Sequence, residues 1–391
     1  MHPLQELDNF MNKKLLLLIP ILLFSACQSN GETSSSEEES KKEGTFTLEI
    51  ENAQTEYTIR DEFEPSSQMK VFAIGENGEK RQLDNKEYRI DSSEFLSERV
   101  GTYPITIYAD DLNASIKYEV NVNVLKSFSI LMIGNSHTDD TIQWAHEIAN
   151  NLGLENVEIA DLYYGGSGMD IHLDNIMNNK KAYAFRQYRN GVWYTKEGTS
   201  IPEAIMSKEE GWDYICLQEK AWYGAIDYEW DILDTYFELV EHYAHPRTRY
   251  CWNLTWAHNN AYTSADKTLD EVFNGDQVAM YNAEQSGVMR NIVGREEFDF
   301  IIDGGTAVQN ARSSYLTDKR ISRDYTHLSY DLGRFIVGLN LIKTISDVDL
   351  TNISWRPNGI SDVEMAIAVE SVENCAIDKF HITQSMYKVE P

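Results

Sequence analysis

Cysteine and positive charge are both scarce in this chain of 391 residues. It has four cysteines, and no two of them form a Cys-x-x-Cys pair, which excludes the commonest zinc-binding pattern. Lys and Arg number 34 against 63 Asp and Glu, which gives a formal net charge of −29. Such an excess of negative charge repels nucleic acid phosphates and anionic lipid head groups. We therefore expect no nucleic acid partner, and substrates that are neutral or small.

Motifs for phosphate and metal binding are also missing. The sequence has no glycine-rich phosphate loop and no His-Glu-x-x-His pattern. His242 and His245, in "EHYAHP", could form a metal pair, but a histidine near a predicted helix end also interacts favourably with the helix dipole. We therefore expect no metal ion and no organic cofactor.

Residues 1–26 have the features of an export signal. Lys13 and Lys14 precede an apolar run at 15–24, which is too short for a permanent membrane span. The following Ser-Ala-Cys27 resembles the lipobox of bacterial lipoproteins. This resemblance implies cleavage before Cys27, a lipid on its sulfur, and an exported protein that meets the cell membrane only through that anchor, facing the extracellular side or the periplasm. An ordinary secretory signal is the alternative.

The next segments predict a tether and a small domain. Residues 27–44 are rich in Ser, Glu and Lys and lack large apolar side chains, which favours a disordered tether. Between 45 and 125 apolar residues alternate with polar ones, as at Ile105 and Ile107, without any helical stretch. This pattern predicts an all-β sandwich. The segment "VGTYPITIYADDLNASIKYEVNVNV" resembles the closing strands of bacterial Ig-like domains, and we interpret this domain as a spacer without a ligand.

Residues 126–391 have a different texture, in which continuous apolar runs alternate with helix-like stretches. This order predicts an α/β domain, a doubly wound parallel sheet of about five strands covered by helices on both faces. Cys216 and Cys251 lie inside two of the apolar runs, where a free cysteine behaves as a small core residue. A disulfide among these two and Cys375 is the alternative in an oxidising compartment.

Ser136, in "IGNSHTDD", follows the first predicted strand of this domain. Ligands of open parallel sheets bind beyond the carboxyl ends of the strands, so this loop borders the expected crevice. A serine there is either a nucleophile or the cap of the next helix. Thr138 or Asp139 could also supply the cap, so the loop alone leaves both roles open.

Asp324 and His327, in "RDYTH", are three residues apart just before a long helix-like run near the end of the domain. A serine hydroxyl needs an imidazole to accept its proton, and the imidazole needs an acceptor that fixes its tautomer. His327 and Asp324 can supply both. The alternative is a surface pair that caps the final helix.

Four segments together resemble the SGNH hydrolases, also called GDSL-type esterases: "IGNSHTD", "YYGGSGMD", a strand ending in "LQE", and "RDYTHLS". The resemblance is to the lipoprotein-borne branch catalogued as a domain of unknown function. It implies a flavodoxin-like three-layer sandwich in which Ser136 is the nucleophile, His327 the general base and Asp324 its orienting carboxylate. It also implies an oxyanion hole from the backbone N–H of Ser136 and of a glycine, matched to Gly168, with Gly165 and Gly166 as rivals.

The chain departs from the family pattern in two places. The first block reads Gly-Asn135-Ser instead of Gly-Asp-Ser, and the third block's Gly-x-Asn-Asp is absent. Gln218, at the end of "DYICLQ", offers the same kind of amide donor, and Asn253 is a less favoured candidate. The substitute matters because losing one oxyanion donor costs on the order of 10²-fold in rate.

The sequence therefore predicts a cell-surface serine esterase that removes acyl groups, acetyl above all, from a carbohydrate or another small ester. An inactive glycan-binding lipoprotein and an acyltransferase with the same triad are the alternatives. His172 could line the pocket or lie on a helix surface, and the aromatic residues of "AWYGAIDYEW" could stack on a sugar or fill the core. The oligomeric state is not specified by the sequence.

Overall fold

The computed structural model describes residues 45–189, 191–259, 261–262, 264 and 267–389. The expected signal 1–26, the tether 27–44 and Cys27 lie outside the described residues. No helix in the described part of the chain is both long and apolar enough to cross a bilayer.

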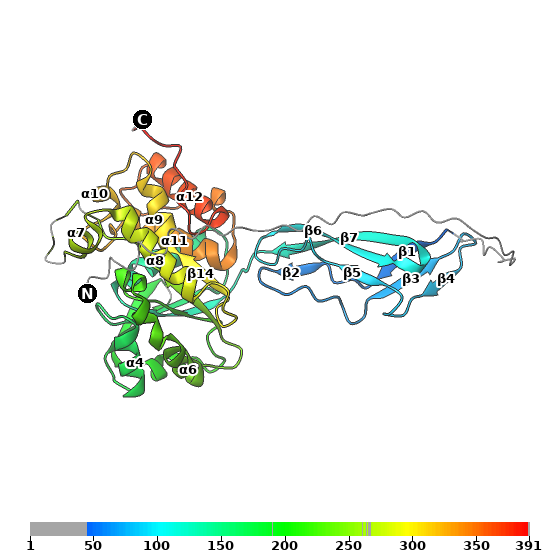
Figure 1. Ribbon diagram of the computed structural model, residues 1–391, viewed down its shortest axis with the longest axis horizontal. Coiled ribbons are helices and arrows are strands. Elements are labelled where there is room, and N and C mark those ends of the chain that lie inside the picture. The colour runs from blue at the N-terminus through cyan, green and yellow to red at the C-terminus, as the bar shows by residue number, and fades with distance from the viewer. Residues whose placement is uncertain (1–44, 190, 260, 263, 265–266, 390–391) are drawn as a thin grey trace, which may run out of the picture. The chain divides into compact units, whose positions relative to one another are not determined.

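The first domain consists of two facing sheets (Figure 1). Alternate side chains of β6 and β7 are buried, among them Ile105, Ile107, Val120 and Val122, because successive residues of a strand point to opposite faces. The predicted Ig-like β-sandwich is thus confirmed. One sheet has the order β1 (Thr47–Glu51), β3 (Lys70–Ile74), β4 (Lys80–Gln82), and the other β2 (Glu56–Thr58), β7 (Ala114–Asn123), β6 (Gly101–Ala109), β5 (Arg89–Asp91).

The second domain is built on a seven-stranded sheet. Its spatial order is β11 (Val192–Thr199), β10 (Tyr183–Arg189), β9 (Glu158–Tyr163), β8 (Ser129–Gly134), β12 (Tyr214–Leu217), β13 (Arg249–Leu254), β14 (Phe300–Asp303). Five neighbouring strands, in the spatial order β9-β8-β12-β13-β14, are parallel. Numbered along the chain, this order is 2-1-3-4-5, as in flavodoxin, and it confirms the predicted doubly wound sheet. The antiparallel hairpin β10–β11, which extends one edge, was not expected.

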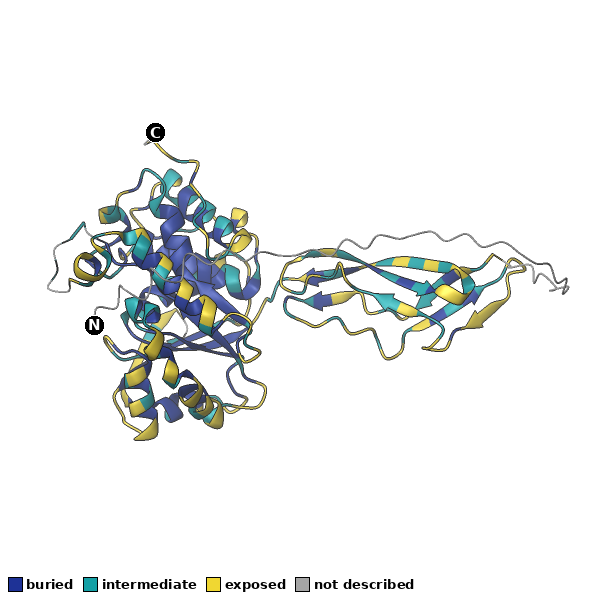
Figure 2. Cartoon of the chain, viewed as in Figure 1, coloured by how far each residue is buried: buried dark blue, intermediate teal, exposed yellow. Residues whose placement is uncertain are grey.

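Helices cover both faces of this sheet, and its five parallel strands are almost wholly buried (Figure 2), whereas β11 at the edge is mostly exposed. Odd and even residues of β8 belong to two separate apolar clusters, one for each face. The first face packs against α2 (Ser136–Ile142), α3 (Ala145–Asn151), α9 (Gly304–Arg312), α11 (Leu332–Ser346) and α12 (Asp362–Ile377). The second packs against α4 (Met169–Met177), α5 (Ile201–Ile205), α6 (Leu233–Tyr243) and α8 (Gln277–Asn291). Shorter elements are η1 (Asp110–Leu112), η2 (Ala221–Ala225), η3 (Asp227–Ile232), α7 (Thr268–Phe273), α10 (Asp318–Ile321) and η4 (Leu350–Asn352).

The three cysteines of this domain are free and buried. Cys216 and Cys251 lie directly opposite each other on the neighbouring strands β12 and β13. They are core residues, as expected, and they form no disulfide.

Candidate active site

Ser136 is the first residue of α2, and the helix is capped by its neighbour Asn135. Asn135 is extended (φ −127°, ψ −153°), and its Oδ1 accepts a hydrogen bond from the N–H of His137 at 2.9 Å. Neither Thr138 nor Asp139 caps the helix. The cap is therefore supplied by Asn135, which leaves the Ser136 hydroxyl available for another partner.

That partner is His327. Its Nε2 lies 2.8 Å from Ser136 Oγ, and its Nδ1 lies 2.9 Å from both carboxylate oxygens of Asp324. Asp324 Oδ1 also accepts hydrogen bonds from the backbone N–H of Thr326 and His327. The three residues singled out in the sequence thus form one hydrogen-bonded chain with the order of a Ser-His-Asp triad.

The triad is open to solvent. The side chain of His327 is 28% exposed and that of Asp324 48%. Burial alone would raise the pKa of Asp324, but the hydrogen bonds from the His327 and Thr326 backbone and from the imidazole outweigh it and hold the pKa below its ordinary value. Asp324 therefore stays ionised at neutral pH, as an orienting carboxylate must.

The loop that carries Asp324 and His327 is held by the segment after β13. Trp256 Nε1 donates to the carbonyl of Thr326 at 2.8 Å, and Asn259 Nδ2 donates to the carbonyl of Asp324 at 2.8 Å. Sequence reasoning missed both residues. Their only signal was a run of hydrogen-bonding side chains, "TWAHN", just beyond a predicted strand.

A buried ion-pair network ties α2 to the same loop. Asp140 is fully buried and accepts hydrogen bonds from Arg323 Nη1 (2.9 Å), Arg334 Nε (2.7 Å) and the Leu328 backbone N–H (3.0 Å). Arg334 also reaches Asp139. Buried charges are tolerated when they are paired in this way, and breaking such a pair is strongly destabilising. The network fixes the position of His327 relative to Ser136.

His137 lies beside His327, with ring centroids 6.0 Å apart. Its ring meets Trp256 edge-on at 4.7 Å. Burial, with smaller contributions from His327 and His258, lowers the pKa of His137 to about 3. His137 therefore stays neutral and adds no charge next to the base.

The glycine loop after β9 packs against the nucleophile turn. Asn135 Nδ2 donates to the carbonyl of Ser167 at 2.8 Å, which fixes the peptide whose N–H belongs to Gly168. Gly168 is the N-cap of α4, and a Cβ there would lie 2.4 Å from Glu219 Oε1. Gly166, by contrast, has φ +70° and faces open space, and Gly165 contacts only Tyr163. The contacts thus favour Gly168 among the three glycines.

His172 supports this loop from within the core. Its Nε2 lies 3.1 Å from Ser167 Oγ and its Nδ1 lies 2.8 Å from the Tyr183 hydroxyl. Burial lowers the pKa of His172 to about 3. It is fully buried, so it neither lines an open pocket nor lies on a helix surface.

The two amides proposed for the missing third block contact each other. Asn253 Nδ2 donates to Gln218 Oε1 at 3.0 Å, so the Asn253 donor is engaged. Gln218 Nε2 is buried and has no hydrogen-bond partner among the described residues. A Cβ on Gly134 would lie 3.0 Å from this nitrogen, which places it under the turn that precedes Ser136. The free donor is therefore Gln218, although in this conformation it is covered by that turn.

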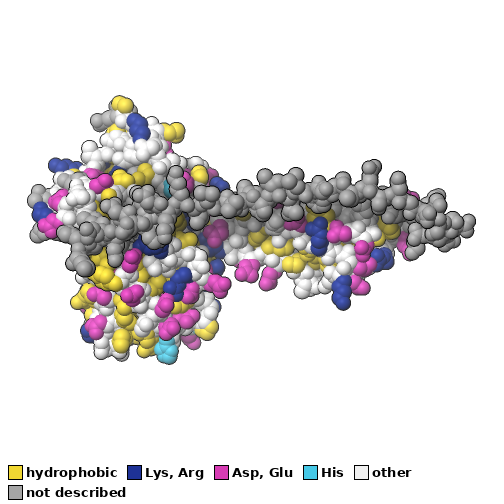
Figure 3. All heavy atoms as spheres, in the orientation of Figure 1, with side chains coloured by type: hydrophobic (Ala, Val, Ile, Leu, Met, Phe, Trp, Pro, Cys, Tyr) yellow, Lys and Arg dark blue, Asp and Glu magenta, His cyan; other side chains and the backbone are white. Residues whose placement is uncertain are grey.

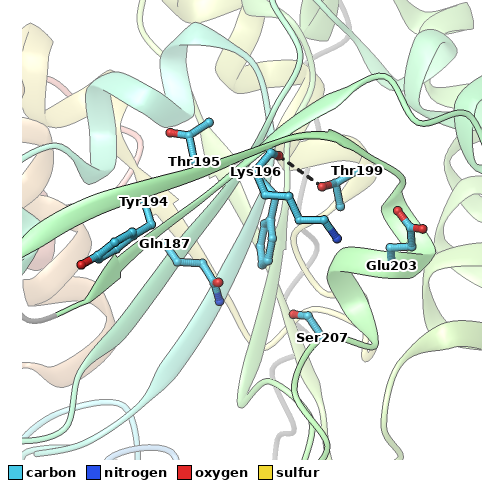
Figure 4. A pocket seen from close by; sticks show the side chains of 8 residues that line it. Gln187, Tyr194, Thr195, Lys196, Thr199, Glu203 and Ser207 are labelled. Atoms are coloured by element: carbon cyan, nitrogen blue, oxygen red, sulfur yellow. Dashed lines mark hydrogen bonds between the residues drawn. The ribbon is translucent and has the colours of Figure 1, made fainter.

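The other residues that the sequence suggested for binding, His242 and the aromatic residues at 222–230, have no described hydrogen bond to the triad. His242 is in the last turn of α6, and residues 45–389, wherever they are described, contain no group of three or more His, Cys, Asp or Glu side chains placed for a metal ion. Trp230 is buried and donates to the carbonyl of Gly224, whereas Trp222 is half-buried. A hollow of about 560 Å³ between β10–β11 and α5, which Lys196, Thr199 and Glu203 line, contains none of the triad residues (Figure 4).

Two family models match the chain: the domain of unknown function DUF4886 at residues 129–375 and the bacterial Ig-like domain (group 3) at residues 50–122. No curated protein matches it. A DUF4886 family protein from Bacteroides uniformis has a similar structure, with a TM-score of 0.61 and 25% identity over 66% of this chain and 98% of that one. A protein from Parabacteroides merdae described as a GDSL-like lipase has a TM-score of 0.36 and 9% identity over 57% and 97% of the two chains. The resemblance inferred from the motifs is thus confirmed, and the chain belongs to the DUF4886 family and carries a bacterial Ig-like domain before its α/β domain.

Proposed function

We propose that the protein is a serine ester hydrolase that works through an acyl-enzyme on Ser136. The observation that carries the proposal is the hydrogen-bonded chain Ser136–His327–Asp324 at the carboxyl end of a doubly wound sheet. Ser136 Oγ attacks the ester carbonyl carbon while His327 Nε2 takes its proton. Asp324 stabilises the imidazolium, which then protonates the departing alcohol. Water activated by His327 releases the acid and frees Ser136.

The tetrahedral intermediate needs hydrogen-bond donors for its oxyanion. The proposed donors are the backbone N–H groups of Ser136 and Gly168. Gln218 is the proposed third donor, since an unpaired buried amide is costly unless a ligand or transition state uses it. Its nitrogen lies against Gly134, the last residue of β8 and two residues before Ser136.

Hydrolysis is favoured over transfer because the triad is open. An acyltransferase must keep water away from its acyl-enzyme, whereas the exposed Asp324 and His327 leave water free access. A binding-only domain has no need of a base hydrogen-bonded to a serine. The acyltransferase and the binding-only protein would each give a different result in the assays that follow.

For the substrate we propose acyl groups, acetyl above all, on a carbohydrate at the cell surface. Where Figure 3 shows described atoms, acidic side chains are spread over this face and Lys and Arg side chains are scattered among them without forming a patch. Export, a lipid anchor on Cys27 and a spacer role for the Ig-like domain complete the proposal. A Cys27→Ser variant should then leave the membrane fraction, whereas wild type stays in it.

The first experiment is hydrolysis of p-nitrophenyl acetate by the wild type, Ser136→Ala and His327→Ala. The proposal predicts turnover well above buffer for the wild type and background for both variants. Equal rates for all three would overturn it and leave a binding protein. Acetate release from an acetylated polysaccharide, with and without an acceptor sugar, then separates hydrolysis from transfer.

A further inference from the structure

Glu219 is a buried acid beside the proposed oxyanion hole. It directly follows Gln218 at the end of β12 and is only 5% exposed. Its two carboxyl oxygens lie 3.3 and 3.2 Å from the backbone N of Met169, the first residue of α4. Oε1 also accepts from the Lys220 N–H and is the atom that a Cβ on Gly168 would meet. The carboxyl group therefore packs against the glycine whose N–H is proposed to bind the oxyanion.

The charges around Glu219 do not compensate a negative charge. Asp170 on α4 and Glu229 on η3 are the acidic groups that act on it, and no ion pair of Glu219 occurs in the described part of the chain. The ammonium of Lys220 lies instead over the Tyr223 ring, 4.6 Å from its centroid. Burial, reinforced by Glu229 and Asp170 and opposed by the Lys220 and Met169 backbone hydrogen bonds, raises the pKa of Glu219 to about 8.

A neutral acid and a carboxylate at this position have opposite effects on catalysis. Both can accept the Met169 N–H and hold the turn at Gly168. Only the carboxylate puts a negative charge next to the place where the oxyanion develops, and in a buried site such a charge opposes the transition state. A carboxylic acid kept neutral by its surroundings near an oxyanion hole has a known precedent in enzymes.

We propose that Glu219 is a positioning residue of the oxyanion hole that acts as the neutral acid, holding Gly168 and Met169 while withholding charge from the oxyanion. This inference rests on the proposed esterase function. It adds to the triad a residue, Glu219, that does not contact the substrate and acts only through Gly168 and Met169.

The test is the pH dependence of kcat/KM for p-nitrophenyl acetate between pH 6 and 9.5, with the full chain and after subtraction of the buffer rate. The wild type should lose about fivefold between pH 8 and 9, as expected for one ionisation with a pKa of about 8 that abolishes activity. Glu219→Gln keeps the shape and the acceptor, so it should retain at least a third of the wild-type rate at pH 7 and lack the alkaline decline. Glu238→Gln, an exposed acid on α6, is the matched control and should follow the wild type.

Two results would overturn the inference while leaving the esterase in place: an alkaline decline of the same size in Glu219→Gln, or loss of most activity in that variant at pH 7. If the wild type hydrolyses no ester at any pH, the proposed function itself fails, and the two failures are thereby distinguished.

The pH dependence of stability gives an independent check. The folded chain holds a proton on Glu219 up to about pH 8, whereas the unfolded chain releases it near the ordinary value of 4.5. The folded state then binds the extra proton, so wild-type stability falls as pH rises through this window. Denaturation midpoints of Glu219→Gln should fall less between pH 5 and 8, and an identical fall in both proteins would show that Glu219 is ionised at neutral pH and contradict the inference.

Discussion

The two sides of the candidate active site are held by opposite kinds of interaction. On the side of the base, the buried Asp140 is paired with Arg323 and Arg334, so charge is fully compensated. On the oxyanion side, Gln218 presents an unpaired donor and Glu219 an acid without a cation. The difference follows from what each side must do. The base has to be fixed in place, whereas the oxyanion side has to accept a charge that arises only during the reaction.

The largest effect should come from removing one member of the hydrogen-bonded triad, which joins the two sides. Ser136→Ala and His327→Ala should each lower kcat by at least about 10³-fold, because the nucleophile and its base act as a unit. Steady-state hydrolysis of p-nitrophenyl acetate measures this.

A matched control for this prediction exists within the chain. His381 is hydrogen-bonded to Asp378, with Nδ1 and Oδ1 2.9 Å apart and the same three-residue spacing as in the triad. It is exposed, however, and no serine bonds to it in the described part of the chain. His381→Ala should leave kcat unchanged. Equal losses in the two histidine variants would contradict the assignment.

Removing the charge of Asp140 should disrupt the ion-pair network on the side of the base and lower the stability of the domain. Asp140→Asn removes the carboxylate that the buried Arg334 and the partly exposed Arg323 share, while Arg334 keeps its contact with Asp139, and we expect a loss of about 3 kcal/mol in the free energy of unfolding. Chemical denaturation measures it. Asp139→Asn is the comparison, since Asp139 is partly exposed and should cost less. A larger loss at Asp139 would show that the network is organised differently.

The uncompensated side should respond in rate as well as in stability. Gln218→Leu removes the unpaired donor together with the Asn253 hydrogen bond, and it should lower kcat by about 10²-fold, as loss of one oxyanion donor does. The free energy of unfolding should also fall, by about 1 to 3 kcal/mol, because the buried Asn253 Nδ2 loses its acceptor. A stability loss without a rate loss would make Gln218 a purely structural residue.

The smallest effect should come from crowding the oxyanion side without removing a donor. Gly168→Ala places a Cβ 2.4 Å from Glu219 Oε1, so the turn has to shift, and we expect kcat to fall about tenfold with little change in KM. Gly165→Ala is the matched control, because its Cβ would meet only the Tyr163 hydroxyl, at 3.1 Å. Similar losses in both variants would mean that Gly168 is not the donor.

The resemblance to the SGNH hydrolases supplied the link between Ser136 and His327, whereas local sequence patterns predicted the parallel sheet, the Ig-like sandwich and the Asp324–His327 pair. Each depends on a short-range signal: alternation within a strand, apolar runs between helices, or two residues three positions apart. The hairpin β10–β11 was not predicted although its Asn-Gly pair is a strong turn signal, because it is largely polar and lacks the continuous apolar runs that mark the parallel strands.

The supports of the site could not be read from the sequence in the same way. Asp140 and Arg323 are 183 residues apart, and Trp256 lies 70 residues from the carbonyl it holds. No local pattern marks such pairs. The Asp378–His381 pair has the same spacing in the sequence as Asp324–His327. Local pattern therefore does not distinguish the two pairs, and only the folded structure shows which one meets a serine.

The hydrogen bond between His327 and Ser136 closes a loop of 191 residues. The serine sits at the end of the central strand β8, and the histidine arrives after the last strand has been placed. Contacts this distant in sequence form late in folding, because the entropy of closing the loop must be met first. Ester hydrolysis would therefore report on completion of the whole α/β domain, and a chain that has folded only in part would be catalytically silent.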